Sequence, residues 1–340
     1  MTEHYRAIRL ERFASSFRAA TDIVALPLTA PGPGEIRVRN RWCGINGIFD
    51  TQIARNAVDY VPVKPPSLTG VEAIGIVDAI GAGVREFAVG DAAVTVRFPG
   101  GYREANIGPA ENFTRVPAAS REWLALASTG VSALLALEHI GAVKDGETVA
   151  ISAAAGGLGH FLVQLALLRG CHVIAVCGGP DKAAFVRQLG AHRVIDYRAE
   201  DVGAVLASEY PGAIDVAIDS VSGAIFDAFL SQMAHHGRVV LAGAATDLDG
   251  KPELVTAPRI VHSIYYRGVS VRGFMNGLLA DHWPAARERV FGLYQSGHLA
   301  VTFDAENFHG LEGVYDAVER LLSGQTTGKV VVELADTKGT

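Results

Sequence analysis

A glycine-rich turn between two apolar runs constrains the fold of this chain more than any other feature. Residues 152–160 read SAAAGGLGH, which follows the short apolar run ETVAI and precedes the longer run FLVQLALL. The first run predicts a buried strand, and the second, which continues for about three turns before Arg169-Gly170, predicts a helix. The local plan is therefore strand, glycine turn and helix.

The small residues of this turn match a G-x-G-x-x-G fingerprint, with alanine in place of the first glycine. Small side chains at Ala154, Gly156 and Gly159 permit a tight turn, let backbone N–H groups approach a pyrophosphate, and let the helix pack close to the strand. A plain tight turn is the alternative interpretation. We expect a dinucleotide to contact five residues of the turn: Ala154, Gly156, Gly157, Leu158 and Gly159.

Strands and helices alternate between residues 123 and 274. Apolar strands are predicted at TVAIS, HVIAVC, RVIDY, IDVAIDS, RVVLAG and GVSVRGF, and helices at 158–169, 181–189, 201–209 and 223–235. Repeated strand–helix units with apolar strands indicate a parallel sheet that is covered on both faces. This context favours the dinucleotide interpretation, and we expect residues 123–274 to form a Rossmann domain, a doubly wound α/β fold.

The rest of the chain follows a different pattern. Up to about residue 120, short β-rich runs alternate with Pro and Gly clusters such as PGPGE and KPPSLTG, which is typical of a compact, partly barrel-like β domain. After residue 274, helices are predicted near 283–296 and 311–323, followed by a last strand, KVVVEL. We expect one β-rich domain made of residues 1–122 and 275–340.

Composition narrows the function classes. The 340 residues carry a formal net charge of −6 with scattered basic residues, so we expect a small-molecule partner and neither nucleic acid nor a membrane. Three cysteines form neither a disulfide framework nor a zinc knuckle, and the N-terminus has charges where a signal peptide needs apolar residues, so we expect a cytoplasmic protein. The uncharged stretch 123–137 is too short to span roughly 30 Å of hydrocarbon and predicts a buried core helix.

The second predicted strand indicates which dinucleotide binds. About twenty residues past the glycines, an NAD-binding domain presents an acidic residue to the ribose, whereas this chain has Cys177 and Gly178. A phosphate is held by a lysine and repelled by a carboxylate, so Lys182 and the missing acid favour NADP(H). Alternatively, Lys182 is an exposed residue in the first turn of a helix. Tyr197, after the third strand, flanks the same pocket or belongs to a solvated turn.

The carboxyl ends of the remaining strands complete the expected binding region. Ligands of open α/β sheets bind outside these ends. We therefore expect the cofactor to contact the residues that end the last three strands, and the substrate to contact the two residues that follow. These are Asp219, Ser220, Ala242, Gly243 and Phe274 for the cofactor, and Met275 and Asn276 for the substrate pocket.

Several longer motifs resemble one superfamily. The order of β domain, Rossmann domain and strand tail, with VKPPSLTGVEAIGIV, VGDAAVT, AAAGGLG and GKVVVEL, resembles the medium-chain dehydrogenase/reductase superfamily. CHVIAVC, IDSVSGAIFD and SVRGF are most similar to its zinc-free quinone oxidoreductase and prostaglandin reductase branch. The resemblance covers essentially the whole chain and implies a GroES-like catalytic domain in addition to the Rossmann domain.

The zinc ligands of the superfamily's alcohol dehydrogenases do not occur in the matching motifs. Where those enzymes carry a Cys and a His, this chain has Asn46 in CGINGIFD and Val71 in TGVE. Neither side chain supplies a thiolate or an imidazole. His235 and His236, adjacent on a predicted helix, point about 100° apart. We therefore expect no metal site.

A zinc-free member must hold the negative charge on its acceptor by hydrogen bonds alone. Hydride addition to the β-carbon of an enone yields an enolate, which is less basic than the alkoxide of a simple ketone and depends less on a Lewis acid. The resemblance thus implies an NADPH-dependent reductase of activated double bonds, such as enones, enals or 15-keto prostaglandins. Two alternatives stay open: an NADPH:quinone oxidoreductase and a non-catalytic NADPH-binding protein.

The resemblance also implies roles for single residues. Asn46 matches the asparagine beside the nicotinamide and substrate in zinc-free members, Ser132 matches a threonine on the nicotinamide side, and Lys329 matches a position near the cofactor. The structural alternatives are a turn-forming Asn46 before Gly47 and a Ser132 hydroxyl bonded to its own helix. For the proton donor, Tyr60 is the nearby phenol and solvent is the competitor.

The last strand of the series, GVSVRGF, is expected at an edge of the sheet. An uncovered edge invites pairing with a second copy of the chain, and similar proteins form dimers in this way. We therefore expect a homodimer through this edge strand.

Overall fold

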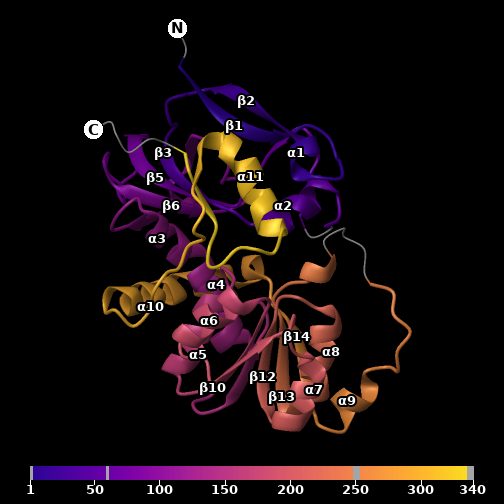
Figure 1. The fold of residues 1–340 in the computed structure, drawn as a ribbon. Coiled ribbons are helices and arrows are strands. Elements are labelled where there is room, and N and C mark those ends of the chain that lie inside the picture. The colour runs from indigo at the N-terminus through magenta and orange to yellow at the C-terminus, as the bar shows by residue number, and fades with distance from the viewer. Residues whose placement is uncertain (1–2, 59–60, 248–252, 335–340) are drawn as a thin grey trace. The chain divides into compact units, whose positions relative to one another are not determined.

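The chain divides into two compact units. The computed structural model describes residues 3–58, 61–247 and 253–334 (Figure 1). The first unit comprises Met1–Ser128 and Phe303–Thr340, and the second comprises Thr129–Thr302. They correspond to the expected β-rich and doubly wound domains, except that the second unit extends to Thr302 and does not end at residue 274.

Side-chain contacts explain why this boundary lies later than expected. Helix α10 (Trp283–Gln295) is held by an ion pair of 2.7 Å between Arg289 and Glu138. Beyond it, the backbone N–H of Ala300 donates to Gln164 Oε1 at 2.8 Å, and Gln164 Nε2 donates back to the Ala300 carbonyl at 3.0 Å. The segment after the last strand therefore packs on the second unit, which no sequence pattern indicated.

The second unit contains a six-stranded sheet in which all strands are parallel. The order is β11-β10-β9-β12-β13-β14. Strands β10 and β11 therefore follow on one side of β9, and β12, β13 and β14 follow on its other side. This order confirms the predicted doubly wound fold. The strands are β9 (Thr148–Ile151), β10 (His172–Cys177), β11 (Arg193–Asp196), β12 (Ile214–Asp219), β13 (Met233–Leu241) and β14 (Ser270–Gly273).

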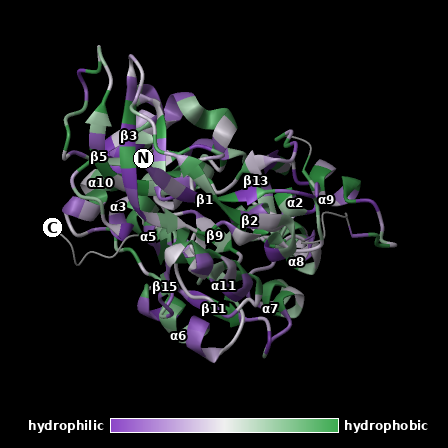
Figure 2. Cartoon of the chain, turned by 90° about the horizontal axis from the view of Figure 1, so that it is seen from above, coloured by the Kyte–Doolittle hydropathy of each residue, from purple (hydrophilic) through white to green (hydrophobic). Residues whose placement is uncertain are grey.

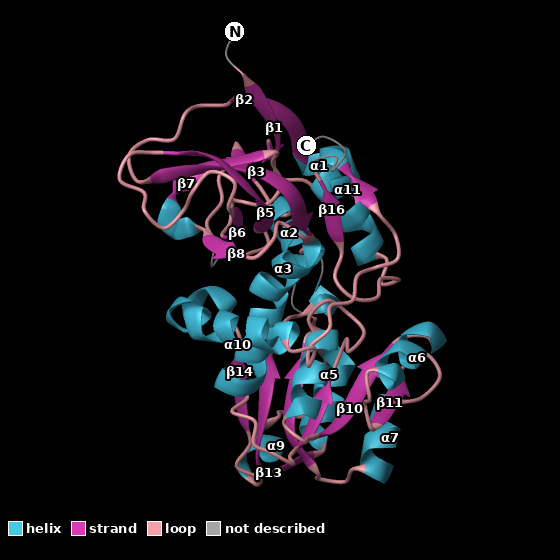
Figure 3. Ribbon diagram, turned by 90° about the vertical axis from the view of Figure 1, so that its left-hand side faces the viewer, coloured by secondary structure: helices cyan, strands magenta, loops and turns pink. Residues whose placement is uncertain are grey.

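Helices cover both faces of this sheet. In Figure 1, α5 (Gly159–Leu168) and α6 (Pro180–Gln188) lie on one side of the strands, and α7 (Val202–Glu209) and α8 (Gly223–Ser231) lie on the other. In Figure 3, α5 lies in front of the strands. Most buried side chains of β9, β10, β12 and β13 are aliphatic because both faces are covered; the exceptions, Cys177, Asp219 and Met233, lie at strand ends. A short helix, α9 (Val261–Tyr265), precedes the edge strand β14.

One predicted helix was too long. The helix expected over 223–235 ends at Ser231, and β13 already begins at Met233, where it pairs with Ile214. His236 has a φ of +61° and its N–H donates to the Arg267 carbonyl at 2.7 Å. The two neighbouring histidines therefore lie in an irregular strand and not on a helix, because tertiary pairing overrides the local helical pattern.

The first unit is built from two sheets, as the β-rich pattern predicted. The larger sheet has the order β15-β16-β3-β5-β6-β8 with β7 paired to β3, and the smaller has the order β2-β1-β4. Strand β3 alternates partly exposed and buried residues from Glu35 to Asn40, and hydrophilic and hydrophobic residues both occur along it (Figure 2). The strands are β1 (His4–Leu10), β2 (Thr21–Pro27), β3 (Glu35–Gly44), β4 (Ser67–Leu68), β5 (Glu72–Ile80), β6 (Ala92–Val96), β7 (Ala105–Pro109), β8 (Thr114–Val116), β15 (Phe308–His309) and β16 (Val331–Glu333).

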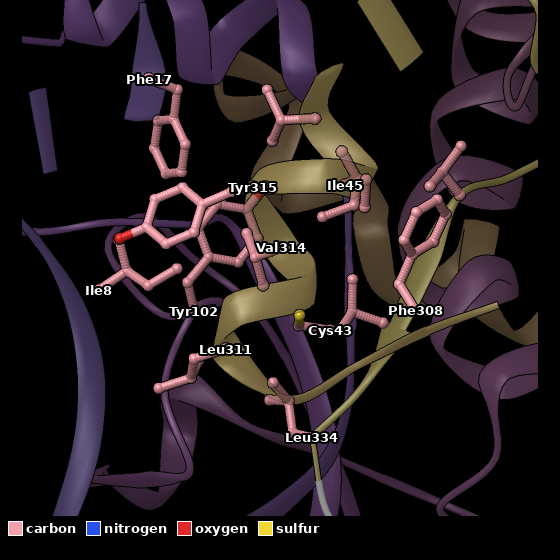
Figure 4. Packing of buried hydrophobic residues seen from close by; sticks show 14 of the residues in the cluster. Ile8, Phe17, Cys43, Ile45, Tyr102, Phe308, Leu311, Val314, Tyr315 and Leu334 are labelled. Carbon is pink, nitrogen blue, oxygen red and sulfur yellow. The ribbon is translucent and has the colours of Figure 1, made fainter. Parts of the chain in front are cut away.

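The C-terminal segment completes this unit. Strand β16 pairs antiparallel to β3 with Val332 opposite Cys43. Helix α11 (Gly310–Leu322) buries its apolar face against α1 (Phe17–Ala20) and α2 (Gly47–Ala54), neither of which the sequence predicted. In the core of this unit, Phe17 lies edge-on to Tyr102 with ring centroids 5.7 Å apart (Figure 4).

One long apolar helical stretch runs from Arg121 to Ile140. It consists of α3 (Arg121–Ala125), a π-helical turn (Leu126–Gly130), α4 (Val131–Leu134) and a second π-helical turn (Leu135–Ile140). Among the described residues, it alone is long and apolar enough to cross a membrane, but 72% of its apolar window is buried inside the protein. The expectation of a buried core helix is confirmed. Short 3₁₀ helices occupy Ala110–Asn112, Ala245–Asp247 and Asn276–His282.

Candidate active site

The glycine turn after β9 has the geometry that close contact with a dinucleotide requires. A Cβ atom on Gly159 would lie 2.2 Å from the Ala153 carbonyl oxygen and 2.6 Å from Ala154 Cα, so only glycine fits between the turn and the start of α5. The Gly156 N–H donates to the Ala153 carbonyl at 2.9 Å, and the Ala154 N–H donates to the Val176 carbonyl of β10 at 3.0 Å. The turn is thereby fixed, with small residues throughout, and fits a pyrophosphate at the helix N-terminus.

A buried histidine that the sequence did not single out supports this turn. His160 is fully buried; its Nε2 accepts the Thr302 N–H at 3.3 Å, and its Nδ1 lies 3.0 Å from the Gly156 carbonyl. Because Nε2 accepts, Nδ1 must carry the proton and donate to Gly156, so the ring is neutral. His160 therefore acts as a bridge that holds the turn in place.

The loop after β10 contains the residues expected around the adenosine end of the cofactor. Cys177 is buried, and burial raises the pKa of its thiol to about 11, so it remains neutral at physiological pH. A Cβ on Gly178 would lie 2.4 Å from Tyr197 Cζ, which means that the half-exposed tyrosine ring rests on the glycine backbone. Lys182 lies in the first turn of α6. The structure thus brings Gly178 and Tyr197 together, as predicted.

A carboxylate nevertheless reaches this loop. Asp196, at the end of β11, accepts the N–H of Gly179 at 2.7 Å and the N–H of Arg198 at 3.0 Å through the same oxygen. The search for an acid after β10 missed it because it comes from the neighbouring strand.

The end of β12 is organised by a buried acid. Asp219 Oδ1 accepts the Ser152 hydroxyl at 2.6 Å and the Val221 N–H at 2.9 Å, and Oδ2 accepts the Ser222 N–H at 3.0 Å. Ser152 in turn accepts the Ser220 N–H at 2.8 Å. Both carboxylate oxygens of Asp219 are therefore used inside the protein, and its contribution to a binding site is to shape the strand end next to the glycine turn.

The other expected residues of the second unit lie at the predicted strand ends. The Ala242 N–H donates to the Asp219 carbonyl at 2.6 Å, and the Phe274 N–H donates to the Leu241 carbonyl at 2.9 Å. A Cβ on Gly243 would lie 3.0 Å from the Ser220 carbonyl oxygen, so these two strand ends approach closely.

Three further residues of the second unit were expected near the cofactor or the substrate: Ser132, Met275 and Asn276. Met275 is 38% exposed. The Asn276 side chain accepts the indole N–H of Trp283 at 2.9 Å, which commits its carbonyl oxygen to the protein. Ser132 is half-buried in α4, between the two π-helical turns. Such turns inside helices are frequent at functional sites.

In the first unit, Asn46 is held by a buried ion pair. Asn46 occupies the N-cap position of α2, yet its side chain makes no capping hydrogen bond. Its Nδ2 donates instead to Glu72 Oε1 at 3.0 Å, and the Lys329 ammonium lies 2.5 Å from the same oxygen. A carboxylate only accepts hydrogen bonds, so the amide nitrogen faces Glu72. This argues against the purely turn-forming interpretation of Asn46.

Lys329 and Glu72 are both almost completely buried, at 4% and 1% exposure. Besides Glu72, the Lys329 ammonium donates to the Ile45 carbonyl at 3.1 Å. Lys329 was expected near the cofactor, which stays a prediction, and its charge is paired with Glu72. A Cβ on Gly44 would lie 2.2 Å from Glu72 Oε1, so the carboxylate occupies the space beside this glycine of β3. Among the described residues, Glu72 Oε2 is buried without a hydrogen-bond partner.

A second buried acid lies in the same region. Asp50 in α2 accepts a short hydrogen bond from the Tyr102 hydroxyl, and burial raises the pKa of Asp50 to about 7. Burial, reinforced by the negative charges of Glu72 and Asp50, holds the pKa of the Cys43 thiol well above its ordinary value. Cys43 is therefore a neutral packing residue here and not a nucleophile.

Two expectations concern residues or sites of another kind. Tyr60, the expected proton donor, lies outside the described residues. Within the described part of the chain, no group of three or more His, Cys, Asp or Glu side chains is placed so that it could hold a metal ion.

Two family models match the two units. The alcohol dehydrogenase GroES-like domain matches residues 32–118, and the zinc-binding dehydrogenase family matches residues 157–291. Among curated proteins, prostaglandin reductase-3 of Mus musculus is 37% identical over 318 residues, which cover 91% of this chain and 83% of that protein.

The chain belongs to the quinone oxidoreductase and prostaglandin reductase branch of the medium-chain dehydrogenase/reductase superfamily. A probable quinone oxidoreductase of Leishmania amazonensis is 32% identical and covers 97% of this chain and 98% of its own length. The solved structure of Escherichia coli quinone oxidoreductase complexed with NADPH matches with a TM-score of 0.83 at 26% identity, over 96% of this chain and 99% of that one.

Sequence reasoning found the motif residues of this reductase branch and missed the side chains that support them. Glu72 is the last residue of the motif TGVE, and His160 is the last residue of SAAAGGLGH. Neither residue type predicts a supporting role from its position in these motifs. Asp50 and Tyr102 are far apart in the sequence and have no common motif. Asp196 lies in RVIDY, a motif that predicted only a strand.

Proposed function

We propose that this protein is an NADPH-dependent, zinc-independent reductase of activated double bonds, such as those of enones, enals and 15-keto-prostaglandin-like compounds. Family membership supports an oxidoreductase, and the names of the related prostaglandin reductase-3 proteins support this acceptor class. The observation that carries the proposal is Asn46, an N-cap residue whose side chain is withdrawn from capping and held by Glu72.

The cofactor assignment rests on the second unit. The Gly159 position, where a Cβ would meet backbone at 2.2 Å, fits a pyrophosphate against the start of α5. Gly178, Tyr197 and Lys182 would hold the adenosine end, where a 2′-phosphate suits the lysine. When bound, NADPH supplies a hydride.

Asn46 is suited to hold the charge that develops on the acceptor oxygen. One N–H of its amide is fixed on Glu72, so the amide plane is set before a substrate arrives. The second N–H is available as a neutral donor to the carbonyl oxygen of an enone. Hydride addition to the β-carbon breaks the C=C double bond and leaves an enolate, which this donor stabilises. A proton from solvent or Tyr60 then adds to the α-carbon and completes the saturated ketone.

The test is NADPH oxidation with a panel of enones, enals and quinones in metal-free buffer. Asn46→Ala should lower kcat on enones by roughly 100-fold, the typical cost of one preorganised donor, while the Kd for NADPH stays unchanged. Gln52→Ala, at a half-buried position of the same helix, is the matched control and should retain full activity. An enone kcat unaffected by Asn46→Ala would contradict the proposal.

Quinones are the second acceptor class. Relatives in protozoa and bacteria carry the name quinone oxidoreductase, and a quinone oxygen also gains negative charge on reduction. A higher kcat/KM for quinones than for enones across the panel would make quinone reduction the main activity. NADPH binding without turnover of any acceptor would instead support a non-catalytic role.

A homodimer is part of the proposal. Strand β14 lies at the end of the six-stranded order and pairs on one side with β13, so its other edge is available for a second copy. Light scattering after gel filtration should give twice the mass of the chain, which is 35.9 kDa. Val271→Pro removes a backbone donor on this strand and should yield a monomer; an unchanged dimer mass would place the interface elsewhere.

We also place the protein in the cytoplasm. Cys43, Cys171 and Cys177 are all free and buried, which suits a reducing compartment. Fractionation of the native host should recover the protein with cytoplasmic markers, and recovery with membranes or secreted material would contradict this assignment.

A further inference from the structure

The acid at the end of β11 is built into the loop that follows β10. Asp196 Oδ1 accepts two backbone N–H groups, from Gly179 at 2.7 Å and from Arg198 at 3.0 Å. Gly179 has a φ of +99°, which favours glycine, and it is the N-cap residue of α6. Asp196 therefore ties the β10 loop to the β11 loop by one carboxylate oxygen.

This loop is where a Rossmann domain distinguishes the two nicotinamide dinucleotides. The residues after the second strand face the adenosine ribose, whose 2′ position carries a hydroxyl in NADH and a phosphate in NADPH. A carboxylate here accepts a hydrogen bond from the hydroxyl and repels the phosphate. In this chain the second strand ends in Cys177 and Gly178, and the carboxylate arrives from the third strand.

Cations surround the same point. The guanidinium of Arg198 lies close to Gly179, with Nη1 3.6 Å from the position of a Cβ on that glycine. Lys182 and Arg187 on α6 act electrostatically on Cys177, and Arg187 and Arg198 act on Asp196. The two backbone hydrogen bonds, that of Gly179 first, hold the pKa of Asp196 below its ordinary value, so it is anionic at neutral pH. Asp196, which its hydrogen bonds fix in place, thus lies near Lys182, Arg187 and Arg198, with Asp181 as a second carboxylate on α6.

We propose that Asp196 is a specificity-determining residue that limits the preference of this protein for NADPH over NADH. Its backbone hydrogen bonds set the shape of the β10 loop, and its charge, added to that of Asp181 in the first turn of α6, opposes the 2′-phosphate that Lys182 and Arg198 attract. The inference rests on the proposed NADPH-binding function and deepens it, since it assigns the discrimination to one carboxylate.

The decisive variant is Asp196→Asn, because an amide oxygen can accept both backbone N–H groups while the charge is removed. Calorimetry on the full-length protein would measure the Kd of NADPH, NADH, 2′,5′-ADP and 5′-AMP. At low ionic strength, the ratio of Kd for NADH to Kd for NADPH should rise roughly three- to tenfold, as expected for one partly screened charge. The ratio of Kd for 5′-AMP to Kd for 2′,5′-ADP should rise in parallel, and both changes should shrink in high salt.

Asp201→Asn is the matched control. Asp201 is an exposed carboxylate in the same unit that also accepts a backbone N–H, from Ala204 at 2.7 Å, where it caps α7. Its variant removes the same charge a few residues away and should leave the ratio unchanged. Asp196→Ala removes the hydrogen bonds as well, so it should weaken the binding of both dinucleotides.

The possible outcomes separate the inference from the proposed function. An unchanged or lower ratio in Asp196→Asn, or an equal rise in Asp201→Asn, overturns the role of Asp196 while NADPH binding by the unmodified protein still stands. Failure of the unmodified protein to bind NADPH or 2′,5′-ADP overturns the proposed function, and the inference with it.

Discussion

The candidate site residues form two groups, one in each unit, and the two groups are built by opposite means. In the second unit, the glycine turn uses backbone groups and small residues that are consecutive in the sequence, from Ser152 to His160. In the first unit, Asn46 bonds the charged side chain of Glu72, which is 26 positions away in the chain. Lys329 bonds the carbonyl of the neighbouring Ile45, from which it is separated by 284 positions.

This difference predicts which kind of substitution each group of residues tolerates least. The turn is sensitive to steric bulk, because a single Cβ meets backbone atoms that cannot move independently. The cluster around Asn46 is sensitive to charge, because Glu72, Lys329 and Asp50 are nearly removed from water, where an unpaired charge is costly. A substitution that adds only bulk should therefore disturb the glycine turn, and one that removes only a charge should disturb the cluster around Asn46.

The largest effect is expected for Lys329→Met. This variant leaves the Glu72 carboxylate buried without its partner, which should lower the free energy of unfolding by about 3–5 kcal/mol. The double variant Glu72→Gln with Lys329→Met removes both charges and should recover most of this loss. Urea unfolding measures both.

An exposed ion pair provides the control for this cycle. Arg18 pairs with Asp316 at 2.7 Å on the surface, and Arg18→Met should cost less than about 1 kcal/mol. If Lys329→Met proves as mild as Arg18→Met, the buried pair does not dominate the first unit.

The next effect is a pH dependence that arises from Asp50. Its pKa of about 7 in the folded protein lies above that of the unfolded chain, so between about pH 4 and pH 7 the folded state holds a proton that the unfolded state has released. This stabilisation is complete at low pH and is lost as the pH rises through 7. The free energy of unfolding should therefore fall by about 2–4 kcal/mol between pH 5 and pH 8.

Asp50→Asn tests the assignment of this pH dependence. An amide oxygen can still accept the Tyr102 hydroxyl, and the variant has no proton to release, so its unfolding curve should be flatter over the same pH range. Chemical denaturation at pH 5 and pH 8 measures the slope. The same slope in both proteins would assign the pH dependence to another group.

A smaller effect is expected for Gly159→Ala in the turn. The added methyl group meets backbone atoms at 2.2–2.7 Å, and the resulting shift should cost about 1–3 kcal/mol and weaken NADPH binding at least tenfold. Because no charge is involved, the loss should be equal at pH 5 and pH 8.

Gly292→Ala separates bulk from position. Gly292 lies within α10, and an added Cβ meets no atom within 4 Å, so this variant should be neutral or up to about 1 kcal/mol more stable. Equal destabilisation by the two alanines would contradict the steric account of the turn.

The smallest effect is expected for Ser152→Ala. The buried Ser152 hydroxyl donates to Asp219 and accepts from Ser220, so its loss should cost about 1–2 kcal/mol. Ser208→Ala is the control, since the Ser208 hydroxyl only bonds a carbonyl of its own helix at 3.3 Å. Thermal unfolding measures the stability of the two variants. A Ser152 variant as stable as the Ser208 control would show that the hydrogen bonds of Ser152 to Asp219 and Ser220 do not stabilise the protein.

Local patterns predicted the second unit well, because each of its strands and helices is written in one continuous stretch. The predicted strand RVIDY became β11, and the predicted helix 158–169 became α5. The errors lie where distant segments compete: Met233 joined the sheet by pairing with Ile214, and residues 275–302 packed on the second unit through Arg289 and Ala300.

The sequence by itself determined the doubly wound sheet, the glycine turn and the family, because strand and helix periodicity and the need for small residues are local properties of consecutive residues. Only the tertiary structure decided which charges meet. Lys329 reaches Glu72, Tyr102 reaches Asp50, and Asp196 reaches Gly179 from an adjacent strand. Such contacts depend on the packing of elements that are distant in the chain, and buried charges are placed by that packing and not by any repeat in the sequence.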